Sequence, residues 1–318
     1  MRRPVIIASI LALLTACDKP QQPAPNDTPS VPLTEISASS SIFFQVYGAR
    51  EEPRIVPFAI VENGALRPIS LDAGGWESLD SAFFPVGGRL SLYRDGVANG
   101  DIEIVRGMWS SSDGALYSLP GCRLVVPQAQ GKLGPRVAAE ASIEFLASTT
   151  PLKQKTDARA MPKDAITPGR TIANAVASAA EVGPEEVSHL EFIGRWLRTG
   201  AGPEGRTLLA TFIDPEAGDA GPGAGHTVSL LALAEDAGGT FATSYQHVSQ
   251  GEARSVEFRR LVNHADLDGD GIDEILLEAW RYAATPEVVV LKYAGGKWTE
   301  SFRVSENWCL DTKKGDKD

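Results

Sequence analysis

The chain has 318 residues and a formal net charge of −11 at pH 7, and 43% of its residues are hydrophobic. This acidic balance argues against nucleic acid and anionic lipid headgroups as partners, because both are themselves negatively charged. The length suggests about two domains, and the hydrophobic content is sufficient for packed cores.

The N-terminus has the composition of a bacterial export signal. Met1-Arg2-Arg3 is positively charged, and the apolar run from Val5 to Leu14 is too short to span a bilayer as a mature helix. The run leads into Leu14-Thr15-Ala16-Cys17, which resembles the lipobox of bacterial lipoproteins. That resemblance implies a signal peptide over residues 1–16, acyl chains such as palmitate on Cys17, and a lipid bilayer as the first partner. The alternative is an ordinary signal peptide with an incidental cysteine.

Residues 17–40 are rich in Pro, Gln, Asn and Ser, which predicts an extended, poorly ordered tether between the anchor and the folded body. Asp18 directly follows the cysteine, and in enteric bacteria an Asp there tends to retain lipoproteins in the inner membrane. We therefore expect the body to lie on the periplasmic side of an envelope membrane. The inner membrane is favoured and the outer membrane stays open.

Residues 41–148 are expected to form an N-terminal β-rich domain, because short apolar runs alternate there with polar turn residues. The segment 89–94 alternates cleanly and is expected to pair with 101–106. Asn-Gly and Asp-Gly pairs, which favour tight turns, follow several of the runs: Asn63-Gly64, Asp95-Gly96 and Asn99-Gly100.

Residues 149–188 are expected to connect this domain to the next. The first part is polar and reads as a linker, and an Ala-rich helix is predicted over 171–181, where Gly183-Pro184 ends it.

Residues 189–305 contain a weak internal duplication. Segments of the first half recur 57 to 67 positions later, with a loop at 199–206 in the first copy at the position of an acidic loop in the second. Each copy predicts a four-stranded antiparallel meander, and two such meanders could pack as a sandwich or as a propeller fragment. The fold expected is therefore mainly β with one short connecting helix, followed by a charged tail over 306–318.

The acidic loop 266–274, with the sequence DLDGDGIDE, specifies a chemistry more closely than any other stretch. Carboxylates at its first, third, fifth and ninth positions can converge on one hard cation if the chain turns at Gly271. An EF-hand would place a Glu at the twelfth position, which is Leu277 here, and would be flanked by helices. The flanking apolar runs read as strands, so we expect a strand-loop-strand setting.

The segment resembles the calcium loop of FG-GAP and related VCBS-type repeats, D-x-D-x-D-G-x-x-D/E. The resemblance implies calcium as the cofactor and the following ligands: Asp266, Asp268, Asp270, the Ile272 carbonyl and Glu274. Asp273 is expected to point outward or to lie behind the ligands, and His264 is expected at the loop surface because imidazole suits softer ions. The family usually has several copies of the loop, so a complete propeller is not expected. The alternative is an acidic turn that binds nothing.

The two cysteines that remain after lipidation, Cys122 and Cys309, could form a disulfide in an oxidising compartment. They could equally be two buried thiols. Without a C-x-x-C motif a redox enzyme is not indicated.

No catalytic residue is predicted. The chain has four His residues, and it lacks the H-E-x-x-H, G-x-S-x-G and G-x-x-x-x-G-K motifs. We therefore expect a non-enzymatic, membrane-anchored lipoprotein that acts as a binding or scaffolding module for an unknown envelope protein or glycan. The alternatives are an envelope hydrolase or carbohydrate-acting enzyme with a structural calcium, and a purely structural lipoprotein.

Overall fold

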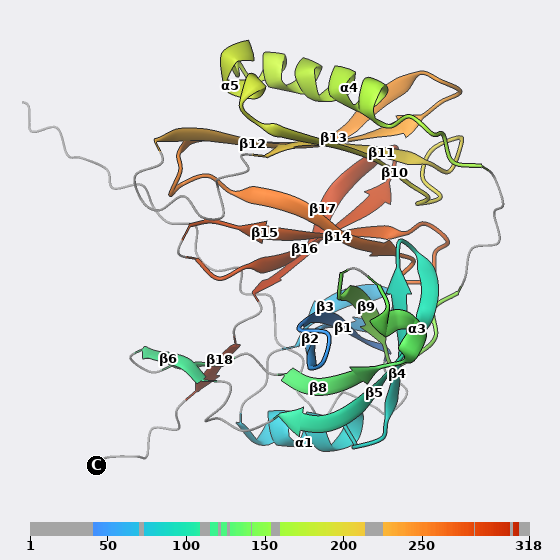
Figure 1. Ribbon diagram of the computed structural model, residues 1–318, viewed down its shortest axis with the longest axis vertical. Coiled ribbons are helices and arrows are strands. Elements are labelled where there is room, and N and C mark those ends of the chain that lie inside the picture. Colours follow the sequence, from blue (N-terminus) through green and yellow to red (C-terminus); the bar gives the residue numbers. More distant parts are fainter. Residues whose placement is uncertain are drawn as a thin grey trace, which may run out of the picture.

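The computed structural model is mainly β, as the sequence predicts (Figure 1). It describes residues 41–69, 73–108, 115–119, 122–125, 128–140, 142–153, 160–213, 225–282, 284–305 and 308–311. The signal peptide, Cys17 and the tether lie outside these ranges. No helix within them is both long and apolar enough to cross a membrane.

The N-terminal region is a closed antiparallel barrel. Its strands pair in the ring β1-β9-β4-β5-β8-β2, and the ring closes because β1 also pairs with β2, while β3 extends the sheet from β2. The strands are β1 (Ser41–Gly48), β2 (Pro53–Glu62), β3 (Ala65–Pro68), β4 (Arg89–Arg94), β5 (Val97–Met108), β8 (Gln128–Leu133) and β9 (Glu144–Ser148). The predicted pairing of 89–94 with 101–106 is confirmed for part of its length, with Arg89 opposite Glu103 and Ser91 opposite Asp101.

Two of the three predicted tight turns are confirmed, whereas Asn99-Gly100 lies within strand β5, beside an irregularity in its pairing with β4. Asn63 and Gly64 turn the chain from β2 to β3, and Asp95 and Gly96 turn it from β4 to β5. All four residues have positive φ, between 52° and 75°, which matches the right-handed twist of the flanking strands.

Alternate residues of the barrel strands belong to two different hydrophobic cores, one inside the barrel and one between the barrel and the C-terminal part of the chain. On β1, Ile42 and Phe44 point into the barrel, whereas Phe43 points outward and packs on the C-terminal sheet formed by residues 258–305. The helix α1 (Ala73–Phe83) covers the barrel core with Leu79, and α3 (Pro135–Ala138) covers it with Val137. Neither helix was predicted. Both are short, and α1 begins with a Gly-Gly pair that weakens helix propensity.

The two predicted meanders are confirmed as two four-stranded antiparallel sheets. The first contains β10 (Glu191–Leu197), β11 (Thr207–Ile213), β12 (His226–Asp236) and β13 (Phe241–Glu252). The second contains β14 (Phe258–Ala265), β15 (Glu274–Trp280), β16 (Glu287–Ala294) and β17 (Lys297–Ser305).

The two sheets share a detailed irregularity that supports the duplication. Each has a bulge in its last hairpin, and the flanking pairs are 57 residues apart: Leu233 with Tyr245, and Val290 with Phe302. The residue left out of the pairing is a serine in both, Ser244 and Ser301. Each serine hydroxyl donates to the carbonyl oxygen of the corresponding residue in the facing strand.

The sheets, the barrel and one helix form a stack of layers (Figure 1). The helix α4 (Ile166–Ala179), which is the predicted Ala-rich helix, covers the outer face of the first sheet, and α5 (Pro184–Ser188) lies beside it. The inner face of the first sheet packs on the second sheet, for example Leu231 near Leu277 in one core cluster. The other face of the second sheet packs on the barrel. The second sheet is therefore buried on both faces.

A small third sheet connects the two cysteine-containing segments. Its order is β18 (Trp308–Asp311), β7 (Cys122–Val125) and β6 (Ala115–Leu119). In its register Cys122 lies opposite Asp311 and Cys309 lies opposite Leu124, so the two cysteines are in adjacent strands without being direct partners. The disulfide stays a prediction.

A buried ion network joins the two sheets at one end. The carboxylate of Glu257 accepts from Arg259 at 2.7 Å and from Arg303 at 3.2 Å, and it also pairs with Arg281. Its backbone N–H donates to Ser249 Oγ of β13 at 2.9 Å. Burial tends to raise the pKa of Glu257, but the Arg303 and Arg259 guanidinium groups outweigh it and lower the pKa to about 2.

We predict that Glu257→Gln lowers the free energy of unfolding by about 3 kcal/mol at neutral pH, since the folded pKa lies below its ordinary value of 4.5. A depressed pKa stabilises the fold above pH 4.5, and this contribution disappears as the pH falls towards 2. Urea unfolding of wild type and variant at pH 7, 4 and 3 should therefore show that the difference between their free energies of unfolding decreases as the pH falls. Glu191, the exposed counterpart in the first copy, provides the control Glu191→Gln. A gap that is constant with pH would contradict the assignment.

Candidate metal centre

The acidic loop lies between β14 and β15, so both of its flanks are strands, as the sequence predicts. Its backbone is folded around its own carboxylates. Asp266 accepts from the N–H groups of Gly269 at 2.8 Å and Gly271 at 3.1 Å, and both glycines have positive φ, 83° and 93°. The sharp turn expected at Gly271 is therefore present.

Further hydrogen bonds fix the remaining carboxylates. Asp268 accepts from the N–H of Asp270 at 3.1 Å, and Asp270 accepts from the N–H of Ile272 at 2.9 Å. Glu274, the first residue of β15, accepts from the N–H of Leu267 at 2.8 Å and so closes the loop across its base.

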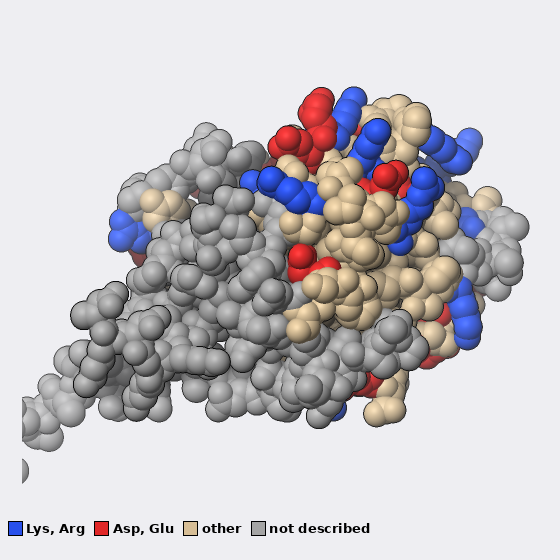
Figure 2. Space-filling model, turned by 90° about the horizontal axis from the view of Figure 1, so that it is seen from below, with Lys and Arg blue, Asp and Glu red and all other residues tan. Residues whose placement is uncertain are grey.

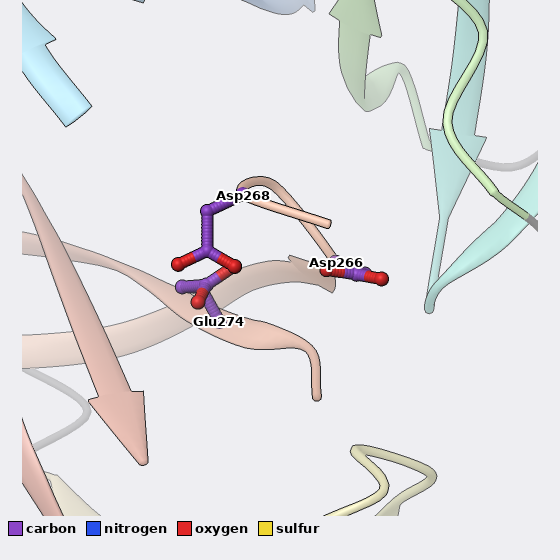
Figure 3. A group of neighbouring side chains, drawn as sticks. All are labelled: Asp266, Asp268 and Glu274. Carbon is purple, nitrogen blue, oxygen red and sulfur yellow. The ribbon is translucent and has the colours of Figure 1, made fainter. Parts of the chain in front are cut away.

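Three of the predicted ligands converge. One carboxylate oxygen from each of Asp266, Asp268 and Glu274 lies within 4.8 Å of the others, and Figure 3 shows Asp268 and Glu274 pointing towards each other with Asp266 beside them. Calcium–oxygen distances of about 2.3–2.6 Å allow ligand separations of this size. The donor set is oxygen only, which suits a hard cation such as Ca²⁺ or Mg²⁺ better than zinc or copper.

Of the other two predicted ligands, Asp270 is not part of this convergent group of side chains, and coordination by the Ile272 carbonyl stays a prediction. Asp270 lies at the rim with its side chain 40% exposed, and its Oδ2 is 2.9 Å from the Lys292 ammonium. Ile272 packs its side chain against the core between the two sheets. The converged trio therefore includes the buried ligands and excludes the most exposed one.

Lys292 of β16 is a residue of the site that the motif does not reveal. Its ammonium nitrogen pairs with Asp268, with Asp270, and with Glu274 at 3.8 Å. The lysine lies outside the loop and reaches it only through the β15–β16 pairing. Comparison of the two copies does indicate it. The 57-residue offset aligns Lys292 with Glu235 of the first copy, so the basic residue occurs only in the copy whose loop has the spaced carboxylates.

The electrostatics of the site reflect this crowding. Burial raises the pKa of Glu274 to about 8, the neighbouring Asp268 charge adds to the rise, and the Leu267 N–H and Lys292 oppose it. Burial tends to lower the pKa of Lys292, but its hydrogen bonds to Asp268 and Asp270 outweigh this and raise it above the ordinary value. The Lys292 ammonium therefore offsets part of the negative charge of the loop.

His264 differs from its predicted surface position, and of the two positions expected for Asp273 the outward one is not adopted. His264 Nδ1 lies 2.7 Å from Asp273 Oδ2, and both side chains are almost fully buried. The reason is strand alternation: Asp273 precedes Glu274 and points to the opposite side of the chain. There the barrel turn at Gly96 and the first sheet cover it.

The loop also touches the matching loop of the first copy. The N–H of Asp273 donates to the Thr199 carbonyl oxygen at 2.7 Å. In that first loop the Thr199 hydroxyl bonds to the Thr207 hydroxyl at 2.7 Å and accepts from the N–H of Ala201 at 3.1 Å. Hydroxyl groups thus close the turn in the copy that lacks the spaced carboxylates.

A cavity of about 320 Å³ opens beside the buried pair, at the junction of the barrel and both sheets. Arg195, Trp196 and Arg198 line it together with His264 and Asp273. Next to it, Asn263 Nδ2 donates to the Tyr93 carbonyl at 2.9 Å and ties β14 to the barrel. The acidic loop is therefore part of a three-way junction.

Comparison with known proteins identifies no relative: no protein family, curated protein or solved structure matches the chain.

We predict that Asp273→Ala lowers the free energy of unfolding by about 1–3 kcal/mol, because it leaves the buried His264 Nδ1 without its partner. Chemical denaturation measures the effect. The control is Asp95→Asn, which removes an exposed ion pair to Arg195 but keeps a residue that tolerates positive φ, and it should cost less than about 1 kcal/mol. Equal losses in the two variants would show that the buried hydrogen bond contributes little.

Proposed function

We propose that the protein is an envelope lipoprotein, held to a membrane by acylated Cys17, whose stacked β modules bind a partner while a calcium ion rigidifies the loop 266–274. The observation that carries the proposal is the convergence of Asp266, Asp268 and Glu274 within 4.8 Å. Hydrogen bonds within the loop preorganise these carboxylates, which reduces the cost of gathering them around an ion.

The partner is proposed to be an envelope protein or a glycan. Figure 2 shows one face of the molecule, and on its described part basic and acidic side chains are interspersed with uncharged ones. Such a surface of mixed character suits a protein or a glycan as the partner. The acidic charge of the whole chain disfavours nucleic acid.

One observation favours the alternative of an envelope hydrolase. The His264–Asp273 pair beside the 320 Å³ cavity is an arrangement that can orient a general base. We favour binding over catalysis, because the sequence contains no catalytic motif that would assign this pair to a reaction.

We predict that Asp268→Ala abolishes the calcium-dependent rise in melting temperature. With a dissociation constant near ~0.1 mM, 1 mM calcium should add about 1.4 kcal/mol, or about 3–5 °C, to the wild type. Differential scanning calorimetry with calcium and with chelator measures the change. Asp101→Ala, which removes an exposed barrel carboxylate, should retain the rise. The same calcium response in wild type and Asp268→Ala would contradict the site.

We also predict that Cys17→Ser abolishes metabolic labelling with radioactive palmitate and moves the protein from the membrane fraction to the soluble fraction of the envelope. Cys122→Ser serves as the control, because it removes a thiol outside the lipobox and should change neither result. Continued palmitate incorporation into Cys17→Ser would overturn the proposed anchor.

A further inference from the structure

The ammonium group of Lys292 already lies among the carboxylates of the loop. It pairs with Asp268, Asp270 and Glu274, and two of these belong to the convergent trio. The ammonium donates hydrogen bonds to Asp268 and Asp270, whereas the Glu274 carboxylate lies farther away at 3.8 Å as an ion pair. Lys292 thus marks a position of cation binding within the cluster.

The two copies of the repeat also differ at the position of Lys292, and the lysine occurs only in the copy that has the acidic loop. The corresponding residue of the first copy is Glu235, which is buried and accepts a hydrogen bond from Trp298 Nε1 at 2.7 Å. The copy with the non-acidic loop therefore has a negative charge at this position, and the copy with the carboxylate loop has a positive one.

We propose that Lys292 and the divalent cation compete for the same carboxylates, so that binding of calcium expels the lysine side chain from the loop. This inference rests on the calcium site proposed above. A divalent ion at 2.3–2.6 Å from Asp268 and Glu274 would lie close to the ammonium, and two positive groups repel strongly at such separations.

The lysine can leave without a change in the backbone. Its side chain is 34% exposed, so a path to solvent exists, and its four-carbon stem is flexible. Its strand β16 is paired on both sides, with β15 and β17, and should stay in place. The exchange is then a side-chain movement.

The exchange sets the calcium threshold. Without the ion, Lys292 neutralises part of the loop charge and keeps the loop folded. Only molecules in which the lysine has left the loop can bind calcium, so the apparent affinity is the intrinsic affinity multiplied by the fraction of such molecules. If the lysine occupies the loop in nine molecules out of ten, calcium binding is about tenfold weaker. The site would then respond to calcium near the ~0.1 mM dissociation constant expected of the natural chain, instead of being filled at much lower concentrations.

The first test is isothermal titration calorimetry of the metal-free full chain with calcium chloride. Lys292→Met should bind calcium at least about tenfold more tightly than the wild type. Lys297→Met is the matched control, because Lys297 lies exposed on the same hairpin, and its affinity should stay within about twofold of wild type.

The second test uses the wild type alone and does not depend on the folding of any variant. Modification of Lys292 by an amine-specific acylating reagent, quantified by mass spectrometry, should rise several-fold when calcium is added, whereas modification of Lys297 should not change. Expulsion of the lysine predicts this exposure, and a fixed electrostatic effect of Lys292 does not.

The outcomes separate the two proposals. Equal affinity of wild type and Lys292→Met, with unchanged Lys292 reactivity, overturns the competition and leaves the calcium site standing. Binding by Lys292→Met alone supports the competition and overturns calcium binding by the natural chain. Absence of binding in both proteins overturns both proposals and makes the cluster a permanent ion network.

Discussion

The buried pair of His264 and Asp273 lies where the acidic loop meets the rest of the fold. Both side chains are buried, and the Asp273 backbone N–H also donates to the Thr199 carbonyl in the loop between β10 and β11. Gly96 of the barrel turn packs on the same pair, where a Cβ would lie 2.8 Å from Asp273 Oδ2. The positive φ of Gly96, 73°, and this close approach together require glycine. Three parts of the chain that are distant in sequence thus meet at one aspartate.

The neighbouring residue gives this junction its significance for function. Glu274 follows Asp273 directly and faces the carboxylate cluster, so the two side chains point to opposite sides of one short segment. An ion bound by Glu274 would restrict the backbone that positions Asp273. The proposed calcium ion would therefore make the contact between the barrel and the sheets more rigid, in addition to ordering its own loop. The cavity beside His264 is lined by residues of this contact.

Local sequence patterns predicted the features that depend on neighbouring residues. Asn63-Gly64 and Asp95-Gly96 form the expected turns, and the two meanders and the strand-loop-strand setting follow from apolar runs and their offsets. The sequence did not predict the closure of the barrel, since β1 pairs with β9 through contacts such as Phe43 with Ser148, about a hundred residues apart. Nothing in either strand specifies that partner.

The errors at the site have the same origin. The loop sequence alone predicts a surface position for His264, but the barrel turn at Gly96 packs on it and it is buried. The motif does not reveal Lys292, because its charge meets the loop only across the β15–β16 pairing. Comparison of the two copies at the 57-residue offset, with Glu235 in place of Lys292, could have revealed the charge reversal.

Hydrogen–deuterium exchange with calcium and with chelator tests most directly whether the loop organises the junction. If it does, calcium should protect the amide of Asp273, which donates to Thr199, and the amide of Asp95, which donates to the Asn263 side chain at 3.0 Å in the barrel contact. Protection confined to residues 267–272, with unchanged exchange at Asp95 and Asp273, would contradict this account.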